Sequence, residues 1–430
     1  MLRTLGNFLE GCRAPAVLEY GEDLIPLRTG EYSFEIRAGR LWIQAWHESR
    51  SLTRQIVGLE QQRPGIVDCI IQRFGGVTGK LSFLDTERPQ TGHRALTGSR
   101  QSFAERFRRM LFRQFPGWRI ASLSSQMDLQ RSFSPVFPRA RLVKGDQQIA
   151  AMACPQAANE PALLSFALLW FDYLAGSACR NDVNTRLCLF LPEEAGALTA
   201  HRLHWLDRSL LRAQLFRFNT HGSAGEVDPR DLGNIDTRVI ASGAEEAHKS
   251  HWSQADESVL ESKVRSRLQV IDASLLASPV LAQVLTFAGG DRDLIDLLAV
   301  DVRGRLALIE LKVSEDLQLP IQALDYWMRL VWHLERGELD RLFPGIALSR
   351  VTPRMLLLAP ALCFHPANTT VIRYFSRSID VERVGINSDW ERDLKVMLRL
   401  PGAQMPQSHG SLNEHPRFSA HQEGHLEPES

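Results

Sequence analysis

The strongest constraint on the fold is a pair of apolar runs in the C-terminal half of the chain. LIDLLAVD (294–301) and LALIELKV (306–313) flank a short segment that contains Gly304. Two such runs around a glycine turn predict a β-hairpin. Strands this apolar are typical of sheets covered on both faces, so we expect helices on either side.

Three charged side chains interrupt these runs. If Asp301 faces Arg305 across the turn, the hairpin places Asp296 opposite Glu310. Glu310 and Lys312 are two residues apart, so they share one face of their strand. A register slip of one residue would separate the three groups, and the sequence leaves that alternative open.

Charges in strands of this kind need partners. An unpaired buried charge is costly, and two adjacent carboxylates repel each other. A bound Mg²⁺ or Mn²⁺ would resolve both problems, because these ions prefer oxygen ligands such as carboxylates. We interpret Asp296 and Glu310 as metal ligands and Lys312 as the group that orients water or stabilises phosphate charge. The alternative is a Glu–Lys pair at a strand rim, with Asp296 as an edge residue.

Two helices are expected beside the hairpin. SQADESVLESKVRSRL (253–268) begins with Ser253 and Asp256 at capping-box spacing, and it carries Glu257 and Glu261 on the face of its apolar residues. Either carboxylate could reach the same metal, or both could lie on a solvated flank.

The second helix follows the hairpin, in IQALDYWMRLVWHL (321–334). Its Gln322 and Tyr326 are four residues apart and therefore lie one above the other on one face. They are candidate site residues or ordinary residues of an amphipathic helix.

In this order, the Glu helix, the I-D-L-L strand, the E-L-K strand and the Q-x-x-x-Y helix resemble the PD-(D/E)xK superfamily of restriction-endonuclease-like nucleases. The nearest branch holds RecB-type and repair nucleases, and the resemblance covers about residues 253–388. It departs from the pattern at Ile295, where the eponymous proline would stand.

The resemblance implies a metal-dependent deoxyribonuclease. It implies that Asp296 and Glu310 bind Mg²⁺ or Mn²⁺ and that Lys312 is catalytic. It implies that Glu261 or, with less support, Glu257 adds a carboxylate. Gln322 would help to position the site, with Tyr326 beside it in the same motif.

The preceding segment has a similar layout and is interpreted as a degenerate copy. RARLVKGDQQIAAMAC (139–154) matches the metal hairpin, and Glu105 takes a place similar to that of the helix carboxylate. The E-x-K position reads as Ala-Met-Ala or Met-Ala-Cys. Apolar residues, namely Phe133, Val136 and Phe137, are expected where the strand acid would be. This copy would bind or dimerise but would not cut.

The chain as a whole is predicted to be α/β. We expect a mainly β N-terminal domain (1–95), a polar linker (86–101), the degenerate α/β core (102–240) and the nuclease-like domain (252–400). YSFEIRAG and RLWIQAW predict two strands joined by a glycine turn. A polar stretch (221–234) marks the boundary between the two α/β domains, and residues 401–430 are predicted to be a disordered tail.

Composition restricts the partners. Formal net charge is zero, so any nucleic-acid binding must rest on local basic patches. No signal peptide or membrane-length apolar run is evident, and six scattered cysteines are typical of a reduced protein, so we expect a cytoplasmic protein. DNA is the expected partner and a homodimer stays open. The alternative function is a non-catalytic nucleic-acid-binding or scaffold protein, and RNA is a further candidate substrate.

Other features carry weaker signals. ERFRRMLFRQFPGWR (105–119) mixes arginines with aromatic rings, which fits phosphate contact or the flank of an amphipathic helix. Trp42, Trp46 and Phe83 could line a binding surface, although core packing is the simpler interpretation. The tail histidines lack the spacing of metal ligands: His409, His415, His421 and His425.

Overall fold

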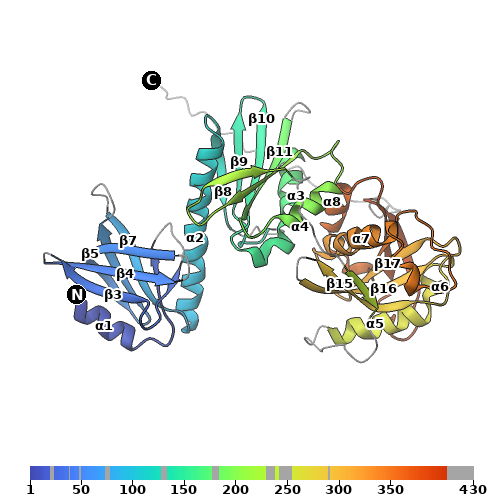
Figure 1. Ribbon diagram of the computed structural model, residues 1–430, viewed down its shortest axis with the longest axis horizontal. Helices are drawn as coiled ribbons and strands as arrows, with labels where there is room; N and C mark the ends of the chain where they lie inside the picture. Colours follow the sequence, from blue (N-terminus) through green and yellow to red (C-terminus); the bar gives the residue numbers. More distant parts are fainter. Residues whose placement is uncertain are drawn as a thin grey trace, which may run out of the picture.

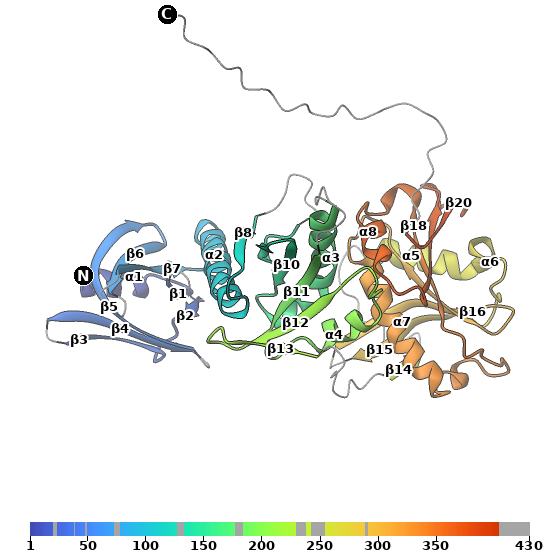
Figure 2. The same cartoon turned by 90° about the horizontal axis from the view of Figure 1, so that it is seen from above.

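The computed structural model describes residues 1–19, 24–37, 39–47, 50–72, 78–126, 133–176, 184–228, 238–241, 254–288 and 291–403. The protein is mixed α/β and is built on three sheets that follow one another along the chain. Figure 2 shows the three sheets in a row, with helices between them.

The first sheet is antiparallel throughout, in the order β2-β1-β7-β6-β5-β4-β3. Helix α1 (Leu2–Glu10) precedes strands β1 (Pro15–Glu19), β2 (Ile25–Pro26), β3 (Tyr32–Arg37), β4 (Arg40–His47), β5 (Arg50–Arg63), β6 (Ile66–Gln72) and β7 (Thr78–Asp85). The predicted turn between β3 and β4 is confirmed, with Gly39 at a φ of 72°. Phe83 lies in the core, whereas Trp46 is 43% exposed.

The predicted linker at 86–101 is wrong, because helix α2 (Pro89–Gln114) begins within it. Proline at the start of a helix leaves no additional donor unpaired, and extension from an established helix costs little. The apolar face around Phe107 anchors the C-terminal part of α2 to the second sheet. Figure 1 shows α2 standing between the first and second sheets.

The second sheet has the order β13-β12-β11-β10-β9-β8. Its strands are β8 (Arg119–Ser124), β9 (Arg139–Lys144), β10 (Gln147–Ala153), β11 (Asn184–Pro192), β12 (Ala213–Phe218) and β13 (Ala224–Val227). The helical segments are η2 (Ala157–Asn159), α3 (Glu160–Gly176) and α4 (Ala197–His204). The stretch predicted as a polar boundary, 221–234, therefore contributes strand β13 to this sheet. We call this sheet with α2, α3 and α4 the middle unit.

The third sheet has the order β14-β15-β16-β17-β18-β19-β20. Its strands are β14 (Arg238–Ala241), β15 (Leu281–Ala288), β16 (Asp291–Val300), β17 (Leu306–Leu311), β18 (Arg354–Pro360), β19 (Asp380–Ile386) and β20 (Val396–Pro401). The helical segments are α5 (Gln254–Ser266), α6 (Leu268–Ile271), α7 (Leu319–Glu335), η3 (Asp340–Leu342), η4 (Ala361–Cys363) and α8 (Asn368–Arg373). We call this sheet with its helices the C-terminal unit.

The middle and C-terminal units share one topology over six strands, and the C-terminal unit has one further edge strand, β14. In each, two antiparallel steps (β8-β9-β10 and β15-β16-β17) are followed by two parallel steps and a final antiparallel strand. A helix precedes each set, and α3 and α7 make the first parallel crossover, α4 and α8 the second. The similar layout predicted from the sequence is therefore present in the fold.

The hairpin β16–β17 is buried on both faces, as its sequence predicts. Leu297 and Ile309 pack into one cluster together with Leu260 and Val264 of α5. Leu298 belongs to the opposite cluster, which contains the apolar face of α7. Each strand residue from 297 to 300 and from 306 to 309 is fully buried, at 0% exposure.

Some expectations fall outside the described residues. These are the predicted tail beyond residue 403 with its four histidines, and Ser253 of the expected capping box. Within the part that the structure describes, no helix is long and apolar enough to cross a membrane.

The hairpin turn supplies a test of the fold. Gly304 has a φ of 77°, and a Cβ added there would overlap the carbonyl oxygen of Ala347. We expect Gly304→Ala to lower the free energy of unfolding by about 3 kcal/mol, measured by urea denaturation, because strain and overlap add.

Gly345→Ala is the matched control. Its φ is 83°, but a Cβ there meets no atom within 4 Å. The control should cost only about 1 kcal/mol, the price of the left-handed backbone alone. Equal losses for the two variants would contradict the close approach at Gly304.

Candidate functional site

The hairpin β16–β17 has the register that the sequence predicts. Leu297 pairs with Ile309, and the pairing runs without a shift to the turn. Continued by one step, this register places Asp296 opposite Glu310. The two carboxylates therefore lie at the end of the hairpin that is remote from the turn.

The side chain of Asp296 is hydrogen-bonded to the backbone of β17. Its Oδ2 accepts a hydrogen bond from the backbone N–H of Leu311 at 2.8 Å. The carboxylate thus takes the place of a backbone acceptor at the point where regular pairing between the two strands stops. Its position is fixed by the strand that carries Glu310.

Gln283 on β15 lies opposite Asp296 on the other side of β16. The flanking pairs are Ala282 with Leu297 and Val284 with Ile295. Between them Gln283 has a φ of 50°, the left-handed region that side chains other than glycine rarely adopt. The regular alternation also breaks here: Ala282 packs against the α5 cluster, whereas Val284 packs into the α7 cluster. Sequence reasoning missed Gln283, because nothing in LAQVLTFA marks a left-handed residue.

Lys312 follows β17 and reaches two carboxylates. Its Nζ lies 3.6 Å from Oε2 of Glu257 and 4.0 Å from Oε1 of Glu310. Burial acts to lower the pKa of Lys312, but Glu310, Glu257 and Asp296 outweigh it, so the pKa is raised. Lys312 is therefore an ammonium cation at neutral pH.

Both candidate carboxylates of α5 belong to this neighbourhood. Glu257 pairs with Lys312, whereas Glu261 is 8% exposed and accepts a hydrogen bond from Nε2 of Gln283 at 3.1 Å. Burial raises the pKa of Glu261, and the bond from Gln283 partly opposes that shift. The choice between the two as a metal ligand stays a prediction.

Asp296 has a strongly perturbed carboxyl group. Burial raises its pKa to about 7. The hydrogen bond from Leu311 and the charge of Lys312 oppose this shift, and the charges of Glu257 and Glu261 reinforce it. A titratable group held close to neutral pH in a cluster of like charges is typical of functional sites.

Gln322 and Tyr326 lie on helix α7. Oε1 of Gln322 is buried, with no hydrogen-bond partner among the described residues. Tyr326 is 4% exposed in the α7 cluster, and the guanidinium of Arg329 lies 5.9 Å from the centre of its ring. Their participation in the site stays a prediction.

The donor chemistry of the cluster suits a hard divalent cation. Asp296, Glu310, Glu257 and Glu261 supply carboxylate oxygens, with Lys312 the ammonium among them. As they stand, the described residues contain no group of three or more His, Cys, Asp or Glu side chains that could hold a metal ion. Binding of an ion would therefore require these carboxyl groups to converge further.

The middle unit has different residues in the equivalent places. The backbone N–H of Cys154 donates to Phe190 at 2.8 Å, as that of Lys312 donates to Leu358 at 2.9 Å. Cys154 therefore corresponds to Lys312, and the residue two before it, Met152, corresponds to Glu310. The sequence left two alternatives for the segment equivalent to E-x-K, and the structure places Met152-Ala153-Cys154 there.

The strand acid of the C-terminal unit corresponds to an arginine. Met152 pairs with Arg139, so Arg139 stands where Asp296 stands in the third sheet. The expectation of Phe133, Val136 or Phe137 at this place was wrong, because the turn at Gly145 pairs Lys144 with Gln147, and this register sets Arg139 opposite Met152. Arg139 is 7% exposed, and its guanidinium lies 4.4 Å from the centre of the Phe133 ring.

The aromatic residues of the arginine-rich segment 105–119 have a structural role. Within 105–119, Phe107 and Phe115 are buried in the core of the middle unit. Glu105 forms an ion pair with Arg108 at 3.4 Å on the exposed side of α2. The helical part of this segment is therefore amphipathic, as expected, and contact of its arginines with phosphate stays a prediction.

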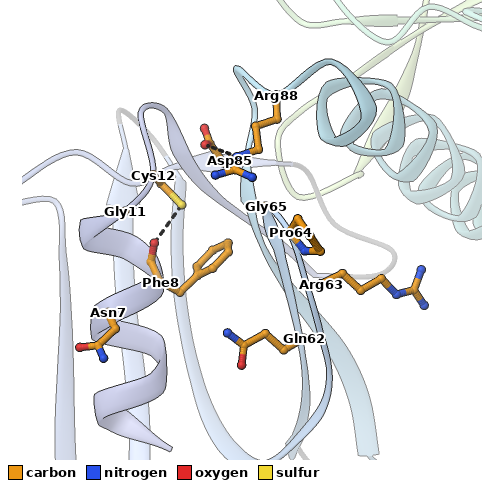
Figure 3. A pocket seen from close by; sticks show the side chains of 10 residues that line it. All are labelled: Asn7, Phe8, Gly11, Cys12, Gln62, Arg63, Pro64, Gly65, Asp85 and Arg88. Carbon is orange, nitrogen blue, oxygen red and sulfur yellow. Dashed lines mark hydrogen bonds and ion pairs between the residues drawn. The ribbon is translucent and has the colours of Figure 1, made fainter.

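A hollow of about 410 Å³ lies in the N-terminal part of the chain, remote in sequence from the carboxylates (Figure 3). It is bordered by Phe8 and Cys12 near the end of α1 and by Asp85 and Arg88. Burial raises the pKa of the Cys12 thiol to about 11, and the thiol donates to the carbonyl of Phe8. A thiol with so high a pKa is a poor nucleophile.

Comparison with family models and with curated protein sequences gave no match to this chain.

The pKa of Asp296 predicts how stability changes with pH in the absence of divalent ions. Its folded-state pKa of about 7 lies above the ordinary value of 3.8, so the folded state binds the proton more tightly. This contribution to stability is complete below about pH 4 and is lost as pH rises through 7. Asp296→Asn should flatten the loss, which urea denaturation at pH 5 and pH 8 in EDTA would measure. An unchanged pH dependence would contradict the assignment.

The backbone of Gln283 predicts an unusual ranking of variants. Gln283→Val should lower the free energy of unfolding by about 2 kcal/mol, because a β-branched residue is strained at this φ. Gln283→Gly should be nearly neutral, since relief of strain offsets loss of the bond to Glu261. Urea denaturation measures both, and a more stable valine variant would contradict the left-handed geometry.

Proposed function

We propose that the chain is a metal-dependent nuclease that hydrolyses phosphodiester bonds in DNA. The observation that carries this proposal is the convergence of Asp296, Glu310 and Lys312 at one end of a doubly buried hairpin, beside the α5 carboxylates. A group of acids around one ammonium ion in this setting has no evident role in packing.

The proposal includes a restriction-endonuclease-like core for the C-terminal unit. Three features support it: an initial helix (α5), an antiparallel hairpin that carries the acids, and a helix (α7) that crosses over to a parallel strand. The same order of elements is repeated in the middle unit, where the acids are absent from the equivalent positions.

In this proposal the acidic residues bind the metal ion and the lysine donates a hydrogen bond. Asp296 and Glu310, with Glu257 or Glu261, would hold Mg²⁺ or Mn²⁺. When bound, the ion supplies Lewis-acid stabilisation of the phosphate and lowers the pKa of its water. The raised pKa of Lys312 keeps this residue protonated, so it serves as a donor to a phosphate oxygen or to water and not as the base. Gln322 and Tyr326 would position these groups from α7.

A second candidate is a non-catalytic nucleic-acid-binding or scaffold protein. Two observations favour it: the described residues form no ready group of metal ligands, and Asp296 is partly protonated at neutral pH. Metal-dependent thermal stabilisation distinguishes the candidates, because an ion that binds only the native state raises its stability. Stabilisation by Mg²⁺ that disappears in Glu310→Gln favours the nuclease.

The direct test is cleavage by the full chain. We expect cleavage of DNA in Mg²⁺ or Mn²⁺ and none in EDTA, with single-stranded, double-stranded and branched DNA and RNA assayed in parallel. Glu310→Gln removes a charge that the site uses and should reduce the rate by about 100-fold or more. Glu335→Gln, at an exposed position at the end of α7, removes the same charge and should retain the rate. Equal rates for the two variants, or no cleavage of any substrate, would overturn the proposal.

A further inference from the structure

The middle and C-terminal units meet through equivalent residues. Leu206, just after α4, forms an isolated antiparallel bridge with Phe375, just after α8. Two backbone hydrogen bonds flank the bridge reciprocally. Asp207 N–H donates to Tyr374 O, and Ser376 N–H donates to Trp205 O, both at 2.8 Å. Since α4 and α8 hold the same place in the two topologies, this contact is self-complementary, as in a two-fold symmetric dimer.

Aromatic contacts repeat the same symmetry. Trp205 packs edge-to-face on Trp327 of α7, with ring centres 4.8 Å apart. Its counterpart Tyr374 packs edge-to-face on Phe171 of α3, at 5.6 Å. In each unit, the aromatic residue just after the second crossover helix thus packs against the first crossover helix of the other unit. Figure 2 shows α3, α4, α7 and α8 gathered between the two sheets.

Ion pairs follow the pattern as well. Arg202 of α4 forms a bidentate pair with Asp325 of α7, with oxygen–nitrogen distances of 2.7 and 2.6 Å. In the reverse direction, Arg373 of α8 pairs with Asp172 of α3 at 2.8 Å. Residues of both units also share one apolar cluster. The two units therefore form an intramolecular pseudo-dimer with a fixed geometry.

The two halves of this pseudo-dimer differ in charge at the equivalent site. Where the C-terminal unit has Asp296 and Glu310, the middle unit has Arg139 and Met152. The middle unit therefore presents a buried cation and a thioether where two carboxylates would hold a metal ion. Such a site repels divalent cations.

We propose that the chain nicks one strand of double-stranded DNA instead of cutting both. This inference rests on the proposed nuclease function. The two backbones of a duplex are related by two-fold axes, which symmetric dimers match. A pseudo-dimer placed across such an axis directs one unit to each strand. The unit with Asp296 and Glu310 cuts its strand, and the unit with Arg139 holds the other strand intact.

Supercoiled plasmid DNA tests this directly, since one nick relaxes the circle and two opposed cuts linearise it. With the full chain in Mg²⁺ or Mn²⁺, we expect nicked circles to accumulate to most of the product before linear DNA appears. Linear DNA that forms in parallel with nicked circles from the start, at low protein concentration, would overturn the inference.

Further outcomes separate this inference from the function on which it rests. Cleavage of single-stranded DNA alone would leave the nuclease in place and refute nicking of a duplex. Absence of cleavage on every substrate would refute the nuclease itself. Met152→Leu, a volume-conserving change in the middle unit, should retain the wild-type nicking rate and product ratio, whereas Glu310→Gln should abolish nicking.

Discussion

The burial of hairpin β16–β17 on both faces is the constraint on which the C-terminal unit depends. Strand residues from 297 to 300 and from 306 to 309 have no exposed surface, and two separate apolar clusters cover them. Helices α5 and α7 must therefore lie on opposite sides of the sheet. Charged side chains on these strands are accommodated at the end of the hairpin remote from the turn, where Asp296 and Glu310 lie.

At that end, the geometry departs from a regular sheet. Asp296 uses its side chain to accept the N–H of Leu311, and Gln283 adopts a left-handed backbone beside it. Strain of this kind persists only where the surrounding structure over-determines it, and it concentrates at functional sites. Here the surrounding interactions are the flanking strand pairs and the bond from Gln283 to Glu261. Gln283 thereby holds Glu261 of α5 in place, and the charges of Glu257 and Glu261 act on Asp296.

The middle unit shows what the same scaffold does without the acids. Arg139 occupies the place of the strand acid and packs over the ring of Phe133. The fold is retained because Met152 and Cys154 satisfy the packing that β10 requires. The reciprocal contacts at Leu206 and Phe375 then join the two units about a pseudo-two-fold axis. The two units are arranged symmetrically but differ in charge at the equivalent site, and this difference would make one unit cut and the other not.

The sequence by itself determined the hairpin, its register, and the neighbourhood of Asp296, Glu310 and Lys312, because apolar periodicity and a glycine turn act over short distances. The alternation of helices and strands in both units was predicted for the same reason. Only the tertiary structure decided that α2 runs through the expected linker, that Arg139 replaces the strand acid, and that Gln283 is left-handed. The course of α2 and the backbone of Gln283 depend on contacts between residues distant in the chain, which no local pattern encodes. The place of Arg139 follows instead from the register of the short hairpin at Gly145, which the structure settles.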